Sequence, residues 1–171
     1  PFNDSLLEND FELLVQSVGD TSESYFMYRD FQARNILVNE NSFCFIDYQG
    51  GMRGPLQYDV ASLLYQSRAG LTPFQRENLL LKYISTLQNY TVVDQEEFIK
   101  KFYCIVLLRT LQTLGTYGFR GLIQRKEIFL KSIPQSMEIV DEMVSKLKGI
   151  LQTEYLFSIL QKISKVSLNN I

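Results

Sequence analysis

The chain has 171 residues, 46% of them hydrophobic and 21% charged, which is enough to bury one sizeable core. Its net charge of −2, with acidic and basic residues interspersed, argues against a nucleic-acid-binding face. The sequence contains no histidine, so a histidine base and a histidine-ligated zinc site are both excluded. No signal peptide is recognisable and no apolar stretch reaches the ~18 residues of a membrane span, so we expect no membrane partner and a cytoplasmic location.

The first part of the chain is predicted to hold one helix and a small β-structure. The helix runs from a cap at Asn3 or Asp4 to about Gln16, with an apolar side formed by Leu6, Leu7, Phe11, Leu14 and Val15. Three strand-like segments follow, at residues 25–28, 36–38 and 43–46. A turn at Glu40 and Asn41 joins the second and third segments into a hairpin, and a glycine-containing loop spans residues 48–57.

From Asp59 onward every predicted element is a helix. Thr72-Pro73-Phe74-Gln75 is a capping box with proline at the first helical position, and Asp94 with Glu97 opens the next helix. The helices are expected at residues 59–67, 72–89, 94–115, 122–132, 134–148 and 152–164. The expected fold class is therefore α+β but mostly α, a helical bundle with a small β-hairpin. Cys44 and Cys104 lie in apolar segments and are expected to be buried free thiols.

Three polar residues around the hairpin have spacings that suit phosphoryl transfer. Asn35 follows Asp30 by five residues, and Asp47 closes an apolar run twelve residues further on. A kinase-type site needs one carboxylate at the substrate hydroxyl, and an amide oxygen with a second carboxylate to hold Mg²⁺ on the phosphates. Asn35 and Asp47 are expected at opposite ends of one strand of the hairpin.

Two sequence blocks resemble a known family. YRDFQARNIL, which begins at Tyr28, and FIDYQGGMRGPLQYDVASLL, which begins at Phe45, resemble the catalytic core of the aminoglycoside phosphotransferase-like (choline kinase-like) kinases. Within that family the chain is most similar to the bacterial N-acetylmuramate/N-acetylglucosamine anomeric sugar kinases. LRTLQTLGTYGFRGL and FLKSIP are similar to a later helix and a Leu-Pro stretch of those kinases, so the resemblance covers roughly residues 25–143.

The resemblance implies a single domain, the C-terminal lobe of a protein-kinase-like fold. Catalytic and metal loops would occupy residues 25–60, and a helical substrate subdomain would occupy residues 61–171. Asp30 would be the catalytic base, Asn35 and Asp47 would bind the cofactors ATP and Mg²⁺, and Arg29 and Asp59 would support the catalytic loop. Candidate substrate contacts are Gln32, Arg34, Arg53, Arg109 and Gln112. For Arg53, Arg109 and Gln112, a solvated surface is the alternative.

Three positions depart from the family pattern. Tyr28 stands where the family has histidine, although an aromatic ring can still pack under the loop. Gln32 replaces a frequent histidine or lysine and offers hydrogen bonds without charge. Gly50 replaces an acid that is frequent in the sugar kinases. These changes affect efficiency and substrate range more than the reaction class.

Kinases of this fold bind ATP beneath a β-rich N-terminal lobe, which supplies a phosphate-covering loop and a strand lysine. No lysine precedes Lys82 in this sequence, and nothing before Tyr25 reads as a five-stranded sheet. We therefore expect a C-terminal fragment whose partner is its own N-terminal lobe, and which is inactive alone.

The sequence thus predicts the catalytic lobe of an ATP- and Mg²⁺-dependent phosphotransferase with an alcohol group as acceptor. The resemblance indicates that the small-molecule substrate is an amino sugar such as N-acetylglucosamine or N-acetylmuramate. Two alternatives stay open: a kinase for an aminoglycoside, choline or homoserine, and a non-catalytic, pseudokinase-type binding module. Retention of Asp30, Asn35 and Asp47 together argues against the module, which would need none of them.

Overall fold

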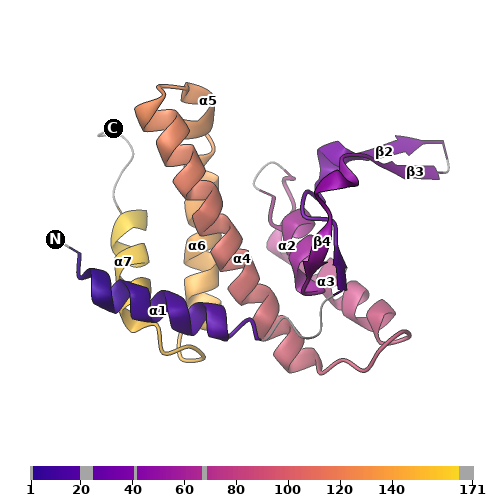
Figure 1. The fold of residues 1–171 in the computed structure, drawn as a ribbon, viewed down its shortest axis with the longest axis horizontal. Helices are drawn as coiled ribbons and strands as arrows, with labels where there is room; N and C mark the ends of the chain where they lie inside the picture. The colour runs from indigo at the N-terminus through magenta and orange to yellow at the C-terminus, as the bar shows by residue number, and fades with distance from the viewer. Residues whose placement is uncertain (1, 20–24, 41, 67–68, 166–171) are drawn as a thin grey trace. The chain divides into compact units, whose positions relative to one another are not determined.

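The computed structural model describes residues 2–19, 25–40, 42–66 and 69–165 (Figure 1). The chain divides into two compact units. One comprises residues 1–19 with 103–171 and is called here the helical unit; the other comprises residues 20–102 and is called the hairpin unit. The described elements agree with the expected α+β, mostly α, class.

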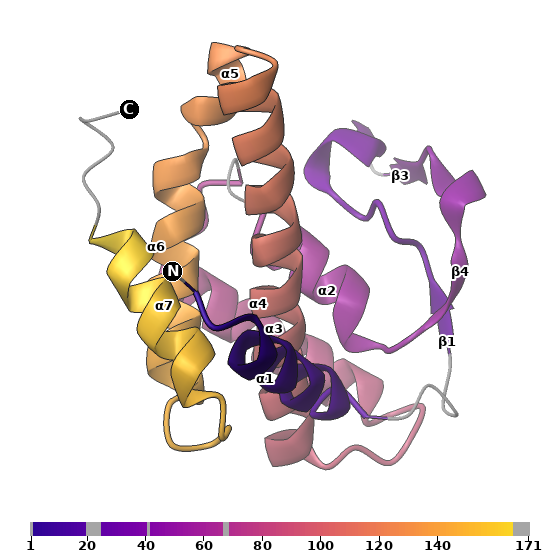
Figure 2. The same ribbon diagram turned by 60° about the vertical axis from the view of Figure 1, so that its left-hand side comes forward.

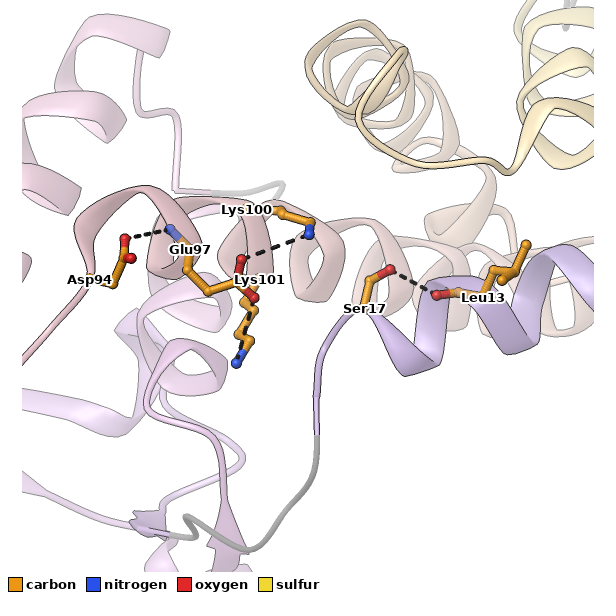
Figure 3. A network of polar contacts seen from close by, with 6 residues as sticks. All are labelled: Leu13, Ser17, Asp94, Glu97, Lys100 and Lys101. Carbon is orange, nitrogen blue, oxygen red and sulfur yellow. Dashed lines mark hydrogen bonds and ion pairs between the residues drawn. The ribbon is translucent and has the colours of Figure 1, made fainter.

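Helix α1 (Asp4–Gln16) begins as predicted. The side-chain oxygen of Asn3 accepts a hydrogen bond from the Leu6 N–H at 3.2 Å, which satisfies one of the free amides of the first turn. At the other end, the Ser17 hydroxyl donates to the Leu13 carbonyl at 2.8 Å (Figure 3). Leu14 is fully buried, whereas Leu6 and Val15 are exposed, so the buried stripe is narrower than the predicted apolar side.

Helix α7 (Glu154–Ser164) packs against both α1 and α6 (Ile133–Leu147) in the helical unit (Figure 2). The core beneath them is apolar and consists of residues such as Val140, Met143, Val144, Leu147, Leu156 and Phe157. One carboxylate interrupts this core, because Asp10 of α1 is buried and accepts the Leu156 N–H at 2.7 Å. Leu156 lies in the first turn of α7, so a side chain from a distant segment caps this helix.

Helix α4 (Gln95–Gly118) also starts at its predicted cap. The Asp94 carboxylate accepts the Glu97 N–H at 3.1 Å, and Glu97 pairs with Lys100 and Lys101, each at 3.7 Å (Figure 3). The helix continues beyond Gly115, its predicted end, to Gly118.

The predicted helix at 122–132 is largely wrong. A π-helical turn (Phe119–Ile123) follows α4, and only α5 (Glu127–Leu130) is α-helical before α6. The turn depends on a close approach, since a Cβ on Gly121 would lie 2.4 Å from Cδ2 of Leu130. Arg125 adopts the left-handed conformation, with φ of 55°, and interrupts regular helix there.

The described residues of the hairpin unit form two small antiparallel sheets; Figure 1 shows the β2–β3 hairpin. Strands β2 (Ile36–Asn39) and β3 (Ser42–Phe45) form the predicted hairpin, and Glu40 of its turn has φ of 46°. Asn41, the other predicted turn residue, lies outside the described residues. Strand β1 (Tyr25–Met27) pairs with β4 (Met52–Gly54), which was expected to be loop. Gly54 permits this pairing, because a Cβ there would lie 2.6 Å from the Met27 sulfur.

Helices α2 (Gln57–Leu64) and α3 (Pro73–Leu87) pack together in the hairpin unit. The capping box at Thr72 and Gln75 is confirmed. Helix α2 starts at Gln57, two residues before its expected start at Asp59, with Leu56 at the N-cap position. Within the unit, the Tyr83 hydroxyl donates to the Leu56 carbonyl at 3.2 Å.

The β2–β3 ribbon is poorly covered by the described residues. None of its residues is buried, and Val38 and Phe43 are 69% and 66% exposed. Cys44 is exposed, so its predicted burial is wrong, whereas Cys104 is buried as expected. A strand's apolar residues are buried only when another layer covers them. No helix among the described residues is both long and apolar enough to cross a bilayer.

Candidate active site

The candidate site begins in the loop between β1 and a 3₁₀ turn (Ala33–Asn35). Asp30 is exposed, and its N–H donates to the Tyr28 carbonyl at 3.0 Å. Asn35 is only 5% exposed, and its side-chain Nδ2 donates to the Asp30 carbonyl at 2.9 Å. Arg29, between Tyr28 and Asp30, has φ of 73°, a conformation that a non-glycine residue keeps only when its surroundings hold it.

Asn35 and Asp47 lie at the same end of the hairpin. The Ile46 N–H donates to the Asn35 carbonyl at 3.0 Å, and Asp47 follows Ile46 directly. The expectation that the two residues stand at opposite ends of one strand is therefore wrong. Asn35 precedes β2 and Asp47 follows β3, and antiparallel pairing brings these two ends together.

Asp47 is also held in the left-handed conformation, with φ of 70° and ψ of 34°. It is exposed, and its Oδ1 accepts a hydrogen bond from Nε2 of Gln49 at 2.7 Å. Two non-glycine residues with positive φ, Arg29 and Asp47, thus flank the candidate site. Such backbone outliers cluster at functional sites.

One face of α2 holds the loop that carries Asp30. The Asp59 carboxylate accepts the Tyr28 N–H at 2.6 Å through Oδ2 and the Arg29 N–H at 3.0 Å through Oδ1. The Ser62 hydroxyl donates to the Arg29 carbonyl at 3.4 Å. Just beyond the helix, Oε1 of Gln66 accepts the Ala33 N–H at 3.3 Å.

Ser62 and Gln66 were not singled out from the sequence. They follow Asp59 by three and seven residues, which is the spacing of neighbours on one helix face. The sequence signal that could have identified them is this spacing of polar residues in a helix that otherwise buries apolar side chains. Gln66 also donates through Nε2 to Oε1 of Gln32 at 3.5 Å, so the half-buried Gln32 is held by the same helix end.

Tyr28 lies at the centre of this arrangement. Its hydroxyl donates to the Ile46 carbonyl, and its ring contacts that of Phe31 edge-on, with centroids 5.5 Å apart. Burial raises the pKa of the Tyr28 hydroxyl, and the negative charges of Asp47, Asp30 and Asp59 raise it further. The three carboxylates of the candidate site are therefore close enough to Tyr28 to act on its ionisation.

The remaining candidates occupy different places. Arg34 is exposed beside Asn35, and Arg53 is exposed on β4, opposite Phe26 of β1. Arg109 and Gln112 lie on α4 within the helical unit, the first half-buried and the second exposed. The roles of these residues in substrate binding stay predictions.

The oxygen donors of the candidate site suit a metal ion whose remaining ligands are phosphates and water. Among the residues that the structure describes, no group of three or more His, Cys, Asp or Glu side chains could hold a metal alone. Mg²⁺ is usually held by one or two carboxylates together with substrate phosphates and water. An amide and a carboxylate at one end of a hairpin, Asn35 and Asp47, supply oxygen donors suited to that arrangement.

A carboxylate on a braced loop, with an amide and a second carboxylate at the adjoining hairpin end, is the set of side chains expected of a phosphoryl-transfer site. The chain belongs to the phosphotransferase enzyme family, which matches residues 4–95, more than half of its length. This match supports the family resemblance of the sequence and a kinase-type phosphotransferase activity. It includes every candidate residue except Arg109 and Gln112. No curated protein sequence matches the chain.

Proposed function

We propose that the chain carries the catalytic site of a kinase that phosphorylates a hydroxyl group of a small molecule, with ATP and Mg²⁺. The supporting observation is the linkage of three candidate residues by hydrogen bonds. Asn35 donates from its side chain to the Asp30 carbonyl, and its own carbonyl accepts the N–H of Ile46, the residue before Asp47. These bonds connect the main-chain segments that carry the three residues.

In this proposal Asp30 accepts the proton of the substrate hydroxyl. The hydroxyl oxygen forms a bond to the γ-phosphorus of ATP, the bond from that phosphorus to the bridging oxygen breaks, and ADP leaves. Asn35 and Asp47 hold Mg²⁺, which neutralises charge on the phosphates when it is bound. Asp59 and Ser62 of α2, and Gln66 just beyond this helix, keep the catalytic loop in place.

The proposed acceptor is an amino sugar, N-acetylglucosamine or N-acetylmuramate. Support for it comes from the sequence blocks that resemble the anomeric sugar kinases. Gln32 contributes here, because a neutral amide held by Gln66 suits the hydroxyl and N-acetyl groups that both sugars carry. Arg34, Arg53, Arg109 and Gln112 are the further candidates for substrate contact.

The test is ADP release by the full-length protein with Mg-ATP across a panel of acceptors. The panel contains N-acetylmuramate, N-acetylglucosamine, an aminoglycoside, choline and homoserine. Turnover with one acceptor should fall by a factor on the order of 10²–10⁴ in Asp30→Asn, because the base is removed. Asp94→Asn, an aspartate of the same unit that only caps α4, is the matched control and should keep full turnover.

Two results would overturn the proposal. Full activity in Asp30→Asn would refute the base assignment. Silence across the whole panel, with ATP binding shown to be intact, would favour a non-catalytic binding module.

A further inference from the structure

The peptide groups next to Asp47 are held on both sides. The Ile46 N–H donates to the Asn35 carbonyl at 3.0 Å, and the Ile46 carbonyl accepts the Tyr28 hydroxyl. The Ile46 side chain is 43% exposed, so burial contributes little to its position. Main-chain hydrogen bonds therefore fix the residue that precedes the second candidate metal ligand.

Tyr28 is itself fixed at its other end. Its N–H donates to Asp59 Oδ2 at 2.6 Å, and its side chain is only 9% exposed. The ring of Phe31 packs edge-on against it, with centroids 5.5 Å apart, and Phe31 in turn contacts Phe45 at 5.8 Å. Tyr28 thus forms a stiff link between helix α2 and the end of β3.

The conformation of Asp47 is not fixed by burial or by a favourable backbone geometry. It is exposed and has φ of 70°, a conformation that aspartate tolerates but does not prefer. Strand β3, which leads to it, has no buried residue to hold it by packing. The Tyr28 hydroxyl binds the peptide group that joins Ile46 to Asp47. The same segment is also held by the pairing of β3 with β2, by the ring contact of Phe31 with Phe45, by the Asn35 carbonyl and by the Gln49 side chain.

We infer that Tyr28 is a positioning residue for the metal site, and that its hydroxyl holds Asp47 in the orientation in which it binds Mg²⁺. The inference rests on the proposed function, because it takes Asn35 and Asp47 as metal ligands. The inferred role belongs to the Tyr28 hydroxyl, which donates to the Ile46 carbonyl, and not to the aromatic ring. The hydroxyl reaches the main chain one residue before Asp47, so its loss changes metal binding without removing a ligand.

The test compares two tyrosine-to-phenylalanine variants of the full-length protein. Tyr28→Phe keeps the ring contact with Phe31 and removes the hydroxyl. Tyr83→Phe removes a comparable hydroxyl-to-carbonyl hydrogen bond in the same unit, the one to Leu56, away from the candidate ligands. Mn²⁺ binding in the presence of a non-hydrolysable ATP analogue is followed by electron paramagnetic resonance, and thermal unfolding is measured in parallel. Asp47→Ala reports on the metal ligand itself.

Tyr28→Phe should weaken Mn²⁺ binding by about five- to tenfold, the effect of one lost hydrogen bond, while Tyr83→Phe leaves it unchanged. In turnover assays the same variant should raise the Mg²⁺ concentration needed for half-maximal rate. Both variants should lower the melting temperature by a similar amount. Unchanged Mn²⁺ binding in Tyr28→Phe, or equal weakening in both variants, would overturn the inference.

A failure of the proposed function can be distinguished from a failure of the inference about Tyr28. If Asp30→Asn keeps full turnover, the base assignment fails, and the Mn²⁺ measurement still decides the role of Tyr28. If Asp47→Ala binds Mn²⁺ as tightly as the wild type does, the metal assignment is refuted, and the inference about Tyr28 is refuted with it.

Discussion

A single carboxylate shapes the candidate site at the scale of residues. Asp59 accepts the N–H groups of two consecutive residues, Tyr28 and Arg29, at 2.6 and 3.0 Å. These amides precede Asp30, and Arg29 has a positive φ, so the loop has no regular secondary structure to satisfy them. Asp59 therefore replaces the backbone partner that a strand or helix would supply.

Removal of this carboxylate should destabilise the hairpin unit. We expect Asp59→Ala to lower the free energy of unfolding by about 2 kcal/mol, because two N–H groups lose a charged acceptor. Asp94→Ala removes a single exposed cap bond and should lower it by about 1 kcal/mol. Urea unfolding of both variants measures the difference. A loss in Asp59→Ala no larger than that in Asp94→Ala would contradict the bracing role.

Helix starts were predictable from the sequence because their signals are local. Asn3, Thr72 and Asp94 each accept a hydrogen bond from an amide three residues later, so a short window of sequence contains the whole interaction. Strand β4 and the π-helical turn were missed for the opposite reason. They depend on the approach of Gly54 to Met27 and of Gly121 to Leu130, and no local pattern predicts which side chain a glycine will contact.

Asp10 is another long-range feature of the elements. It lies on the buried face of α1, one turn before Leu14, where the sequence pattern would place an apolar residue. Its carboxylate accepts the Leu156 N–H in the first turn of α7, and the positive end of that helix favours a negative charge. The contact joins residues 146 positions apart, so only the folded structure explains the acid.

Asp10 should therefore contribute to the docking of α1 on α7. Asp10→Ala should lower the free energy of unfolding by about 2–3 kcal/mol, since a buried N–H is left without a partner. Asp10→Asn keeps an oxygen acceptor but loses the charge, and should lose about half as much. Glu8→Ala, an exposed acid on the same helix, is the control and should have little effect. Chemical unfolding of the three variants measures these losses. Equal losses in Asp10→Ala and Glu8→Ala would refute the capping of α7 by Asp10.

For the whole molecule, the proximity of Asp30, Asn35 and Asp47 was easier to predict than which residues are buried. These three residues lie on one loop and one hairpin, so their spacing in sequence reflects their spacing in the structure. Burial depends instead on which elements cover one another. Phe43 and Cys44 lie in an apolar run and read as a buried strand, yet both are exposed in the described part of the structure.

The two cysteines test this distribution of burial, because each unit contains one of them. In the native 171-residue chain, a thiol reagent should modify Cys44 rapidly and leave Cys104 unreacted. Cys104 should react only when denaturant unfolds the helical unit, since its side chain is fully buried.

Cys44→Ser and Cys104→Ser assign each reacting thiol. Rapid reaction of both thiols in the native chain would show that the core around α4 opens readily. Slow reaction of Cys44 would show that the hairpin is covered, contrary to its exposure in this structure.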